Sequence, residues 1–159
     1  MPAMTDPMQA LISLQNAVDH RLVRLQRCDL YPDLRVLLDQ PAGKPRFTYA
    51  NIEQGKVIAI SMFVLVDPVN GIPCFQTGYA VIDSRRKQGL GSAVLAKGME
   101  ELHNGLKRQG PAKFYVEGVV AVSNIPSNKL AAKSLSATPK PCADCFSGEP
   151  SMQYLKLIE

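Results

Sequence analysis

Tyr79-Ala-Val-Ile-Asp-Ser-Arg-Arg-Lys-Gln-Gly-Leu-Gly-Ser92 is an apolar run that breaks into a basic, glycine-spaced turn and then becomes a helix. Backbone N–H groups at a helix start have no intrahelical partner and lie at the positive end of the macrodipole, so a phosphate is stabilised there. Gly89 and Gly91 carry no Cβ and let the backbone approach a ligand closely. Residues 85 to 87 add three consecutive cations. The stretch predicts an anion cradle for a phosphorylated ligand; the alternative is a plain helix cap with solvated arginines.

Length and composition favour a single domain over residues 1–159. A chain of 159 residues with 46% hydrophobic residues can build a core without disulfides or metal ions. It contains no apolar run long enough to cross a membrane and no signal-peptide pattern at its start, so we expect a cytoplasmic protein without a membrane partner. The net charge of +4 is mild, and no basic tract is interleaved with aromatic residues. A nucleic-acid partner is therefore not expected, and whether the chain forms a homodimer is left open.

The cysteines raise the question of a metal site. Cys142 and Cys145 have the spacing of a ligand pair, but a structural zinc site usually needs a second close pair or histidine partners. Cys28 and Cys74 are isolated in the sequence. Ordinary reduced thiols, with no metal, are the favoured interpretation, and a redox role for the close pair is the weaker alternative.

The first 45 residues are expected to be mainly helical. Asp6 and Pro7 have the order of an N-cap and a first helical residue, and leucines and valines recur at helical spacing through about residue 27. A short second helix is expected over residues 33 to 39, followed by a loop at 40–45.

From residue 46 the pattern becomes that of strands. A hairpin is expected around 53–56, and its return strand, 57–66, is nearly continuously apolar, as in a strand covered on both faces. A third strand over 74–82 completes an antiparallel meander and leads into the cradle and its helix. Residues 114–122 predict a strand parallel to the preceding one, because a helix intervenes. A short helix from Asn124 to about residue 135, a loop or hairpin, and a terminal strand over 152–158 follow.

This order of elements, with Arg86, Gly89 and Gly91 in the spacing Arg-x-x-Gly-x-Gly between a strand and a helix, resembles the GCN5-related N-acetyltransferase (GNAT) family over residues 46–158. Asn124, Ser127, Leu130 and Lys133 are similar to the segment that follows the fifth strand in the branch that acylates ribosomal-protein N-termini. The resemblance implies an α/β (α+β) fold: a mixed, mostly antiparallel twisted sheet flanked by helices, with a parallel pair of strands that splay apart.

The resemblance also implies a cosubstrate, acetyl-CoA, with its pyrophosphate in the cradle and its pantetheine arm along the preceding strand between the splayed strands. A cleft at the carboxyl ends of parallel strands is the place where a ligand is expected on physical grounds too. The residues implied in binding coenzyme A (CoA) are Val81, Asp83, Arg86, Lys87, Gln88, Gly89, Leu90, Gly91, Ser92, Asn124 and Ser127.

Two catalytic groups of the family are missing. The tyrosine that many members use to protonate the leaving thiolate is replaced by Ala131, and the place of the strand glutamate that acts as base in the protein-acetylating branch holds Phe75. Glu117, Tyr79 and Ser123 are the candidates to replace them. Glu117 would be the base if burial raised its pKa, Tyr79 a proton donor, and Ser123 a group that orders water. Each has an ordinary structural alternative, Glu117 as an outward-facing or paired carboxylate, and Tyr79 as a packed strand aromatic.

The sequence therefore predicts an acyl-CoA-dependent N-acyltransferase that passes acetyl to a primary amine by direct attack. Proximity alone supplies much of the rate of such a reaction, so a missing acid does not exclude an enzyme. A catalytically inactive CoA-binding sensor or structural module is the first alternative, and a binder of another phosphate or nucleotide is the second. The resemblance implies that residues 1–45 lie on the side of the acceptor. The acceptor, a small molecule or a peptide amine, is not identified.

Overall fold

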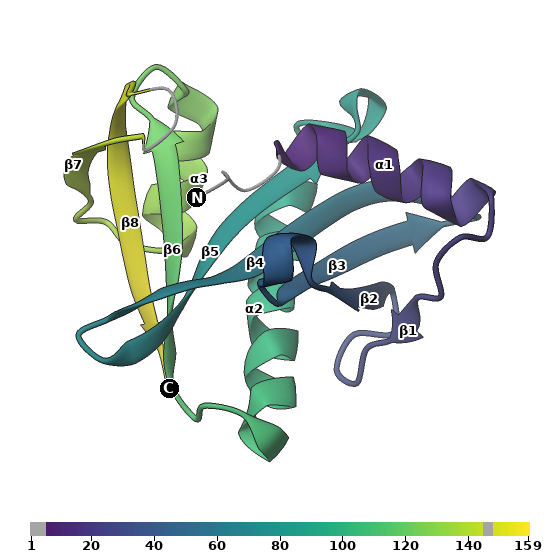
Figure 1. Cartoon of the computed structure of the whole chain (residues 1–159). Helices are drawn as coiled ribbons and strands as arrows, with labels where there is room; N and C mark the ends of the chain where they lie inside the picture. Colours follow the sequence, from purple (N-terminus) through teal and green to yellow (C-terminus); the bar gives the residue numbers. More distant parts are fainter. Residues whose placement is uncertain (1–5, 145–147) are drawn as a thin grey trace.

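The computed structural model describes residues 6–144 and 148–159. An eight-stranded mixed sheet has the strand order β1-β2-β3-β4-β5-β6-β8-β7 and carries helices on both faces (Figure 1). Its elements are α1 (Pro7–Asp19), β1 (Gln26–Arg27), β2 (Leu34–Asp39), β3 (Arg46–Glu53), β4 (Lys56–Val69), β5 (Ile72–Val81), α2 (Leu90–Gln109), β6 (Phe114–Ala121), α3 (Ile125–Ser134), β7 (Lys140–Ala143) and β8 (Pro150–Ile158), with 3-10 turns at Pro41–Gly43 and Asp83–Arg85.

The N-terminal section differs from the sequence prediction in two places. The expected N-cap is confirmed, since the side chain of Asp6 accepts a hydrogen bond from the Met8 amide. The helix, however, ends at Asp19 rather than near residue 27, because Arg21 adopts a positive φ of 55° and turns the chain away. Residues 34–39 form strand β2, paired with β3, and not a helix. Residues 6–45 are thus only partly helical and contribute the sheet's first strands.

The predicted meander is confirmed, and its middle strand is central. β3, β4 and β5 pair antiparallel in sequence order. Residues 57 to 64 of β4 are all buried, with Ile60 and Met62 in the core under α1 and Ile58 and Phe63 in the core under α2. Coverage on both faces explains the continuous apolar run.

β5 and β6 pair only over a short stretch and then separate. The parallel ladder joins Cys74–Gln76 to Tyr115–Glu117, and no further pair follows, although both strands continue. Figure 1 shows the two strands diverging from this point. The splayed parallel pair of the expected fold class is therefore present, and it opens a gap between residues 77–81 of β5 and residues 118–121 of β6.

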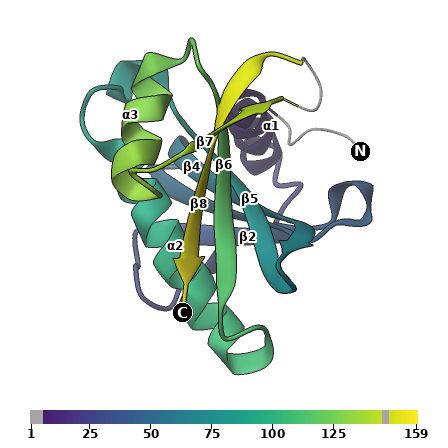
Figure 2. The same cartoon turned by 90° about the vertical axis from the view of Figure 1, so that its left-hand side faces the viewer.

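The two faces of the sheet differ in their helices. α1 packs against β4 and β5 through Leu11 and Leu14, whereas α2 covers the other face through a row that includes Val94 and Leu102. α3 lies on the same face as α2 and contacts β6 and β8 (Figure 2). No helix in the described part of the chain is long and apolar enough to cross a membrane.

Gly98 lets α2 approach the sheet closely, and this contact gives a first prediction. A Cβ at position 98 would clash with Ser61 Oγ and lie 3.0 Å from the Phe63 ring, both fully buried. We expect Gly98→Ala to lower the free energy of unfolding by about 1–3 kcal/mol, the usual cost of overpacking a core. Urea unfolding would measure it. Gly105→Ala is the matched control, because its Cβ would meet nothing within 4 Å, and it should be neutral or stabilising.

Candidate active site

The cradle has the geometry of an anion site. After β5 the chain makes the 3-10 turn Asp83–Arg85, and Gly89 caps α2 in the left-handed conformation, with φ of 76°. Lys87 is also left-handed, with φ of 63°, a conformation that costs energy for a residue with a side chain. Leu90, Gly91 and Ser92 form the first turn of α2, so their amides have no partner within the helix. The loop and the helix start thus present successive backbone N–H groups and two left-handed residues, as anion-binding nests do.

The two arginines of the cradle have different roles in the structure. Arg85 forms an ion pair with Glu53 on the β3–β4 hairpin, at 2.7 Å, and donates to Gln88. This contact lowers the pKa of the Glu53 carboxyl and raises that of Arg85. Arg86 pairs with Asp83 at 3.1 Å and donates to the Val81 carbonyl. Both Arg86 and Asp83 are exposed. Of the two arginines, Arg86 is therefore the one that a ligand can reach.

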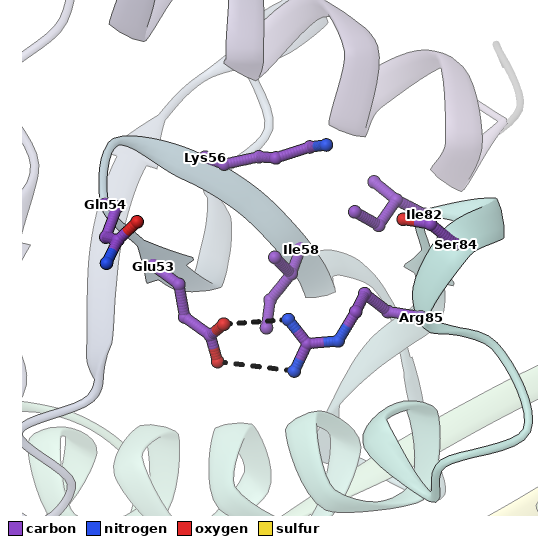
Figure 3. A pocket seen from close by; sticks show the side chains of 7 residues that line it. All are labelled: Glu53, Gln54, Lys56, Ile58, Ile82, Ser84 and Arg85. Atoms are coloured by element: carbon purple, nitrogen blue, oxygen red, sulfur yellow. Dashed lines mark hydrogen bonds and ion pairs between the residues drawn. The ribbon is translucent and has the colours of Figure 1, made fainter.

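A cavity of about 540 Å³ adjoins the cradle on the side of the hairpin. Figure 3 shows the Glu53–Arg85 pair extending across this space, with the side chain of Lys56 along its edge. The pair ties the turn after β5 to the hairpin and fixes the position of the cradle. The cavity is lined by Glu53, Gln54, Lys56, Ile58, Ile82, Ser84 and Arg85.

Residues 77–81 of β5 have no strand partner on the side of the gap. The Ile82 amide donates to the Ile58 carbonyl of the neighbouring strand, and the direction of these groups alternates along an antiparallel strand. The N–H and C=O groups of Tyr79 and Val81 therefore point away from β4, and the Val81 carbonyl accepts from Arg86. The Tyr79 backbone and the Val81 amide are the groups next to the cradle with which an extended ligand can pair.

The first turn of α3 faces the cradle across the gap. Asn124 caps this helix, and its side chain accepts from the Ser127 amide. The Tyr79 hydroxyl lies 3.1 Å from Ser127 Oγ, so this tyrosine reaches from β5 to α3 on the face of α2 and α3. A Cβ on Gly91 would lie only 2.9 Å from the Tyr79 ring. Ala131, at the position expected for the proton-donating tyrosine, is buried one turn after Ser127 and has no functional group. Phe75, at the position expected for the base, packs edge-on against Phe114.

Glu117 lies on the opposite face of the sheet. Its neighbour Val116 packs in the core under α2, so the alternation of the strand turns Glu117 away from that face. The carboxylate accepts a hydrogen bond from Gln153 of β8, at 2.6 Å. Ser123 is exposed in the turn after β6, six residues beyond Glu117. A strand rises about 3.3 Å per residue, so Glu117 and Ser123 do not meet at one reacting atom.

The structure thus brings most of the predicted cofactor residues together on the cradle, the unpaired part of β5 and the first turn of α3. It divides the catalytic candidates, with Tyr79 on one face, Glu117 on the other and Ser123 at the rim. Asp83 and Gln88 are engaged by Arg86 and Arg85.

The sequence does not indicate the roles of two further side chains. Gln153 donates a hydrogen bond to Glu117, and the buried Glu101 accepts hydrogen bonds from the backbone of the loop before β2. Both contacts join residues far apart in the chain, so no local signal indicates them.

Cysteine chemistry adds no metal centre to this site. Within residues 6–144 and 148–159, no group of three His, Cys, Asp or Glu residues could hold a metal ion. Cys145 lies outside the described residues, so the close pair that it forms in the sequence with Cys142 has no structural description here. Burial raises the pKa of the Cys28 and Cys74 thiols to about 12, which keeps both protonated near neutral pH.

The sequence matches no protein-family model and no curated protein, but the fold matches solved structures. One is RimL, a ribosomal-protein alpha-N-acetyltransferase in complex with coenzyme A, with 21% identity, 71% of this chain and 62% of the other covered, and a TM-score of 0.52. A second is the Salmonella typhimurium acetyltransferase that modifies the N-terminal serine of a 50S ribosomal protein, with 19% identity, 72% and 64% coverage, and a TM-score of 0.51. A third is a spermidine N-acetyltransferase chimera from Vibrio cholerae and hSSAT, with 14% identity, 72% and 66% coverage, and a TM-score of 0.51.

These likenesses show the fold: the chain has the architecture of the GCN5-related N-acetyltransferases, as the resemblance in the sequence implied. The matched part covers slightly less than two thirds of each of the two ribosomal-protein acetyltransferases, at 62% and 64% of their lengths.

Proposed function

We propose that the protein is an acyl-CoA-dependent N-acyltransferase, which transfers acetyl from acetyl-CoA to a primary amine by direct attack. The observation that carries the proposal is the cradle at the mouth of the gap between β5 and β6. A pyrophosphate needs clustered N–H donors and cations, and the loop and helix start over residues 86–92 supply both. The arm of CoA carries amide groups, which would pair with the Tyr79 backbone and the Val81 amide.

Three solved structures with this fold support the same chemistry. Two are acetyltransferases of a ribosomal-protein N-terminus, one of them in complex with coenzyme A, and the third is a spermidine N-acetyltransferase. An amine acceptor is common to them. Neither a protein N-terminus nor a polyamine is favoured over the other by the residues of this chain.

The proposed roles of the site residues differ between the two faces of the sheet. On the face of α2 and α3, the cradle would bind the phosphates, Asn124 and Ser127 would contact the arm, and the Tyr79 hydroxyl would protonate the leaving thiolate. On the other face, the Glu117 carboxylate would take a proton from the amine. Holding the amine and thioester together supplies a large part of the lowering of the barrier.

Calorimetry and a thiol-release assay test this proposal. Acetyl-CoA should bind the protein and raise its melting temperature, and one or more amines of a panel of N-terminal peptides, polyamines and simple alkylamines should release free CoA thiol. Binding without thiol release for the whole panel would contradict the enzyme and support the CoA-binding sensor. Failure to bind acetyl-CoA, with stabilisation by another phosphate ligand, would contradict both.

A further inference from the structure

Glu117 stands where the gap begins. The parallel ladder between β5 and β6 ends with the pair Gln76 and Glu117, and beyond it the two strands separate. Its side chain points to the face that α2 and α3 leave uncovered. A group bound at this carboxylate therefore lies at the closed end of the gap, on the side opposite the cradle.

The Glu117 carboxylate is oriented by a neighbour but not neutralised. Gln153 Nε2 donates to Glu117 Oε2 at 2.6 Å, a short bond between a neutral amide and a carboxylate. No lysine or arginine of residues 6–144 and 148–159 forms an ion pair with this carboxylate. Oε1 keeps its lone pairs for a ligand.

Glu117 has polar neighbours as well as apolar ones. Gln76 of β5 pairs with it in the ladder, Gln153 of β8 donates to it, and Lys140 of β7 stands opposite Gln153. Alternation along the strands places Tyr115 and Val119 of β6, and Leu155 and Leu157 of β8, on the same face as Glu117. Leu157 is 37% exposed, and the helix on this face, α1, packs against β4 and β5. Lys156, between the two leucines, reaches to Ser134 on the opposite face. Glu117 is therefore the only charged residue that β6 and β8 present on this face within the described residues.

Cys74 is buried on the same face of β5 as Gln76, two residues before it. Burial raises the pKa of its thiol to about 12, and the negative charge of Glu117 acts in the same direction. The thiol stays protonated and does not compete with an amine for the acyl group. A carboxylate without an ion pair, beside the side chains of Tyr115, Val119 and Leu155, fits a ligand with a positive charge and an apolar part.

We infer that Glu117 binds the ammonium group of the acceptor and takes its proton, and that Gln153 is the positioning residue for this carboxylate. The acceptor is then a cationic primary amine. Its carbon chain lies over Tyr115, Val119, Leu155 and Leu157. This inference rests on the proposed function. The carboxylate of Glu117 accepts one proton from the ammonium. The amine lone pair then attacks the thioester carbonyl and the C–N bond forms. The C–S bond breaks, the electron pair leaves with sulfur, and the thiolate takes a proton from Tyr79 or from water. The nitrogen releases its second proton to the resulting tyrosinate or hydroxide, so the products are a neutral amide and a free thiol.

Hexylamine and its neutral analogue hexan-1-ol test the site in the CoA-saturated protein. Hexylamine should bind the natural protein about tenfold or more tightly than hexan-1-ol. A tenfold ratio corresponds to about 1.4 kcal/mol, which is within the range of one charged hydrogen bond. Glu117→Gln should remove this difference, while CoA affinity and melting temperature stay unchanged. Gln109→Leu, at the exposed end of α2, is the control and should change nothing. Equal affinity of the two probes for the natural protein, or an unchanged difference in Glu117→Gln, would overturn the inference.

A kinetic cycle tests the role of Gln153. Gln153→Leu should lower kcat for hexylamine acetylation about tenfold with a smaller change in KM, because the charge remains but its orientation is lost. Combined with Glu117→Gln, it should cause no further loss, as expected of two residues that act through one contact. Independent, additive losses would overturn the positioning role, and hexylamine that binds without being acetylated would overturn the role of base. A protein that fails to bind acetyl-CoA contradicts the proposed function itself, whereas normal CoA binding with no amine preference contradicts only this inference.

Discussion

Gly91→Val is expected to weaken acetyl-CoA binding about a hundredfold. The new Cβ would lie 2.9 Å from the Tyr79 ring and 3.4 Å from Leu130, so the ring would have to shift beside the first turn of α2. The branched side chain would also shield the amides of the first helical turn. Loss of two charge-assisted hydrogen bonds, at about 1.5 kcal/mol each, corresponds to this factor. Isothermal titration calorimetry would measure it.

The control is Gly105→Val on the same helix, where a Cβ meets nothing within 4 Å. It introduces the same β-branched residue and the same loss of helix propensity, far from the cradle, and should leave CoA affinity unchanged. An affinity of Gly91→Val within about twofold of the natural protein, less than 0.5 kcal/mol, would show that phosphate binds elsewhere.

Glu101→Ala is expected to lower the free energy of unfolding by about 3 kcal/mol. The side chain is 5% exposed and accepts three backbone hydrogen bonds, from Leu30 at 3.2 and 3.0 Å and from Tyr31 at 2.7 Å. Removing a buried carboxylate leaves these amides without their charged acceptor and frees the loop that leads into β2. Urea unfolding monitored by circular dichroism would give the change.

Glu100→Ala, one residue earlier, is the matched control. Its carboxylate accepts a hydrogen bond from the Tyr31 hydroxyl at the surface, where such contacts contribute little, and we expect a change of less than about 1 kcal/mol. Equal effects of the two substitutions would contradict the assignment of Glu101 as the residue that holds the loop.

The parts of the fold that could be predicted are those with local signals. The cradle, the helix after it and the strand before it follow from glycine spacing, cations and a change of hydrophobic period within residues 79–109. The prediction failed at residues 34–39, because the leucines of β2 fit helical spacing as well as a half-buried strand, and only pairing with β3 decides between them. The end of α1 was missed for a related reason: Arg21 supplies the turn without a glycine or proline.

The site was predictable on the side of the cofactor and less so on the side of the acceptor. The residues of the cradle are contiguous, so sequence alone places them together. Glu117 was notable as a charge in an apolar strand, but its orientation depends on where β5 and β6 separate, and its partner Gln153 comes from a strand 36 residues later. Contacts of this kind follow from the sheet order, which the sequence does not state.

The most direct test of the account is a crystal structure of the protein with CoA. The account predicts the pyrophosphate at the backbone amides of residues 87–92, with the pantetheine arm in the gap and paired with Tyr79 and Val81. CoA density outside the gap, or phosphates bound away from the start of α2, would contradict it.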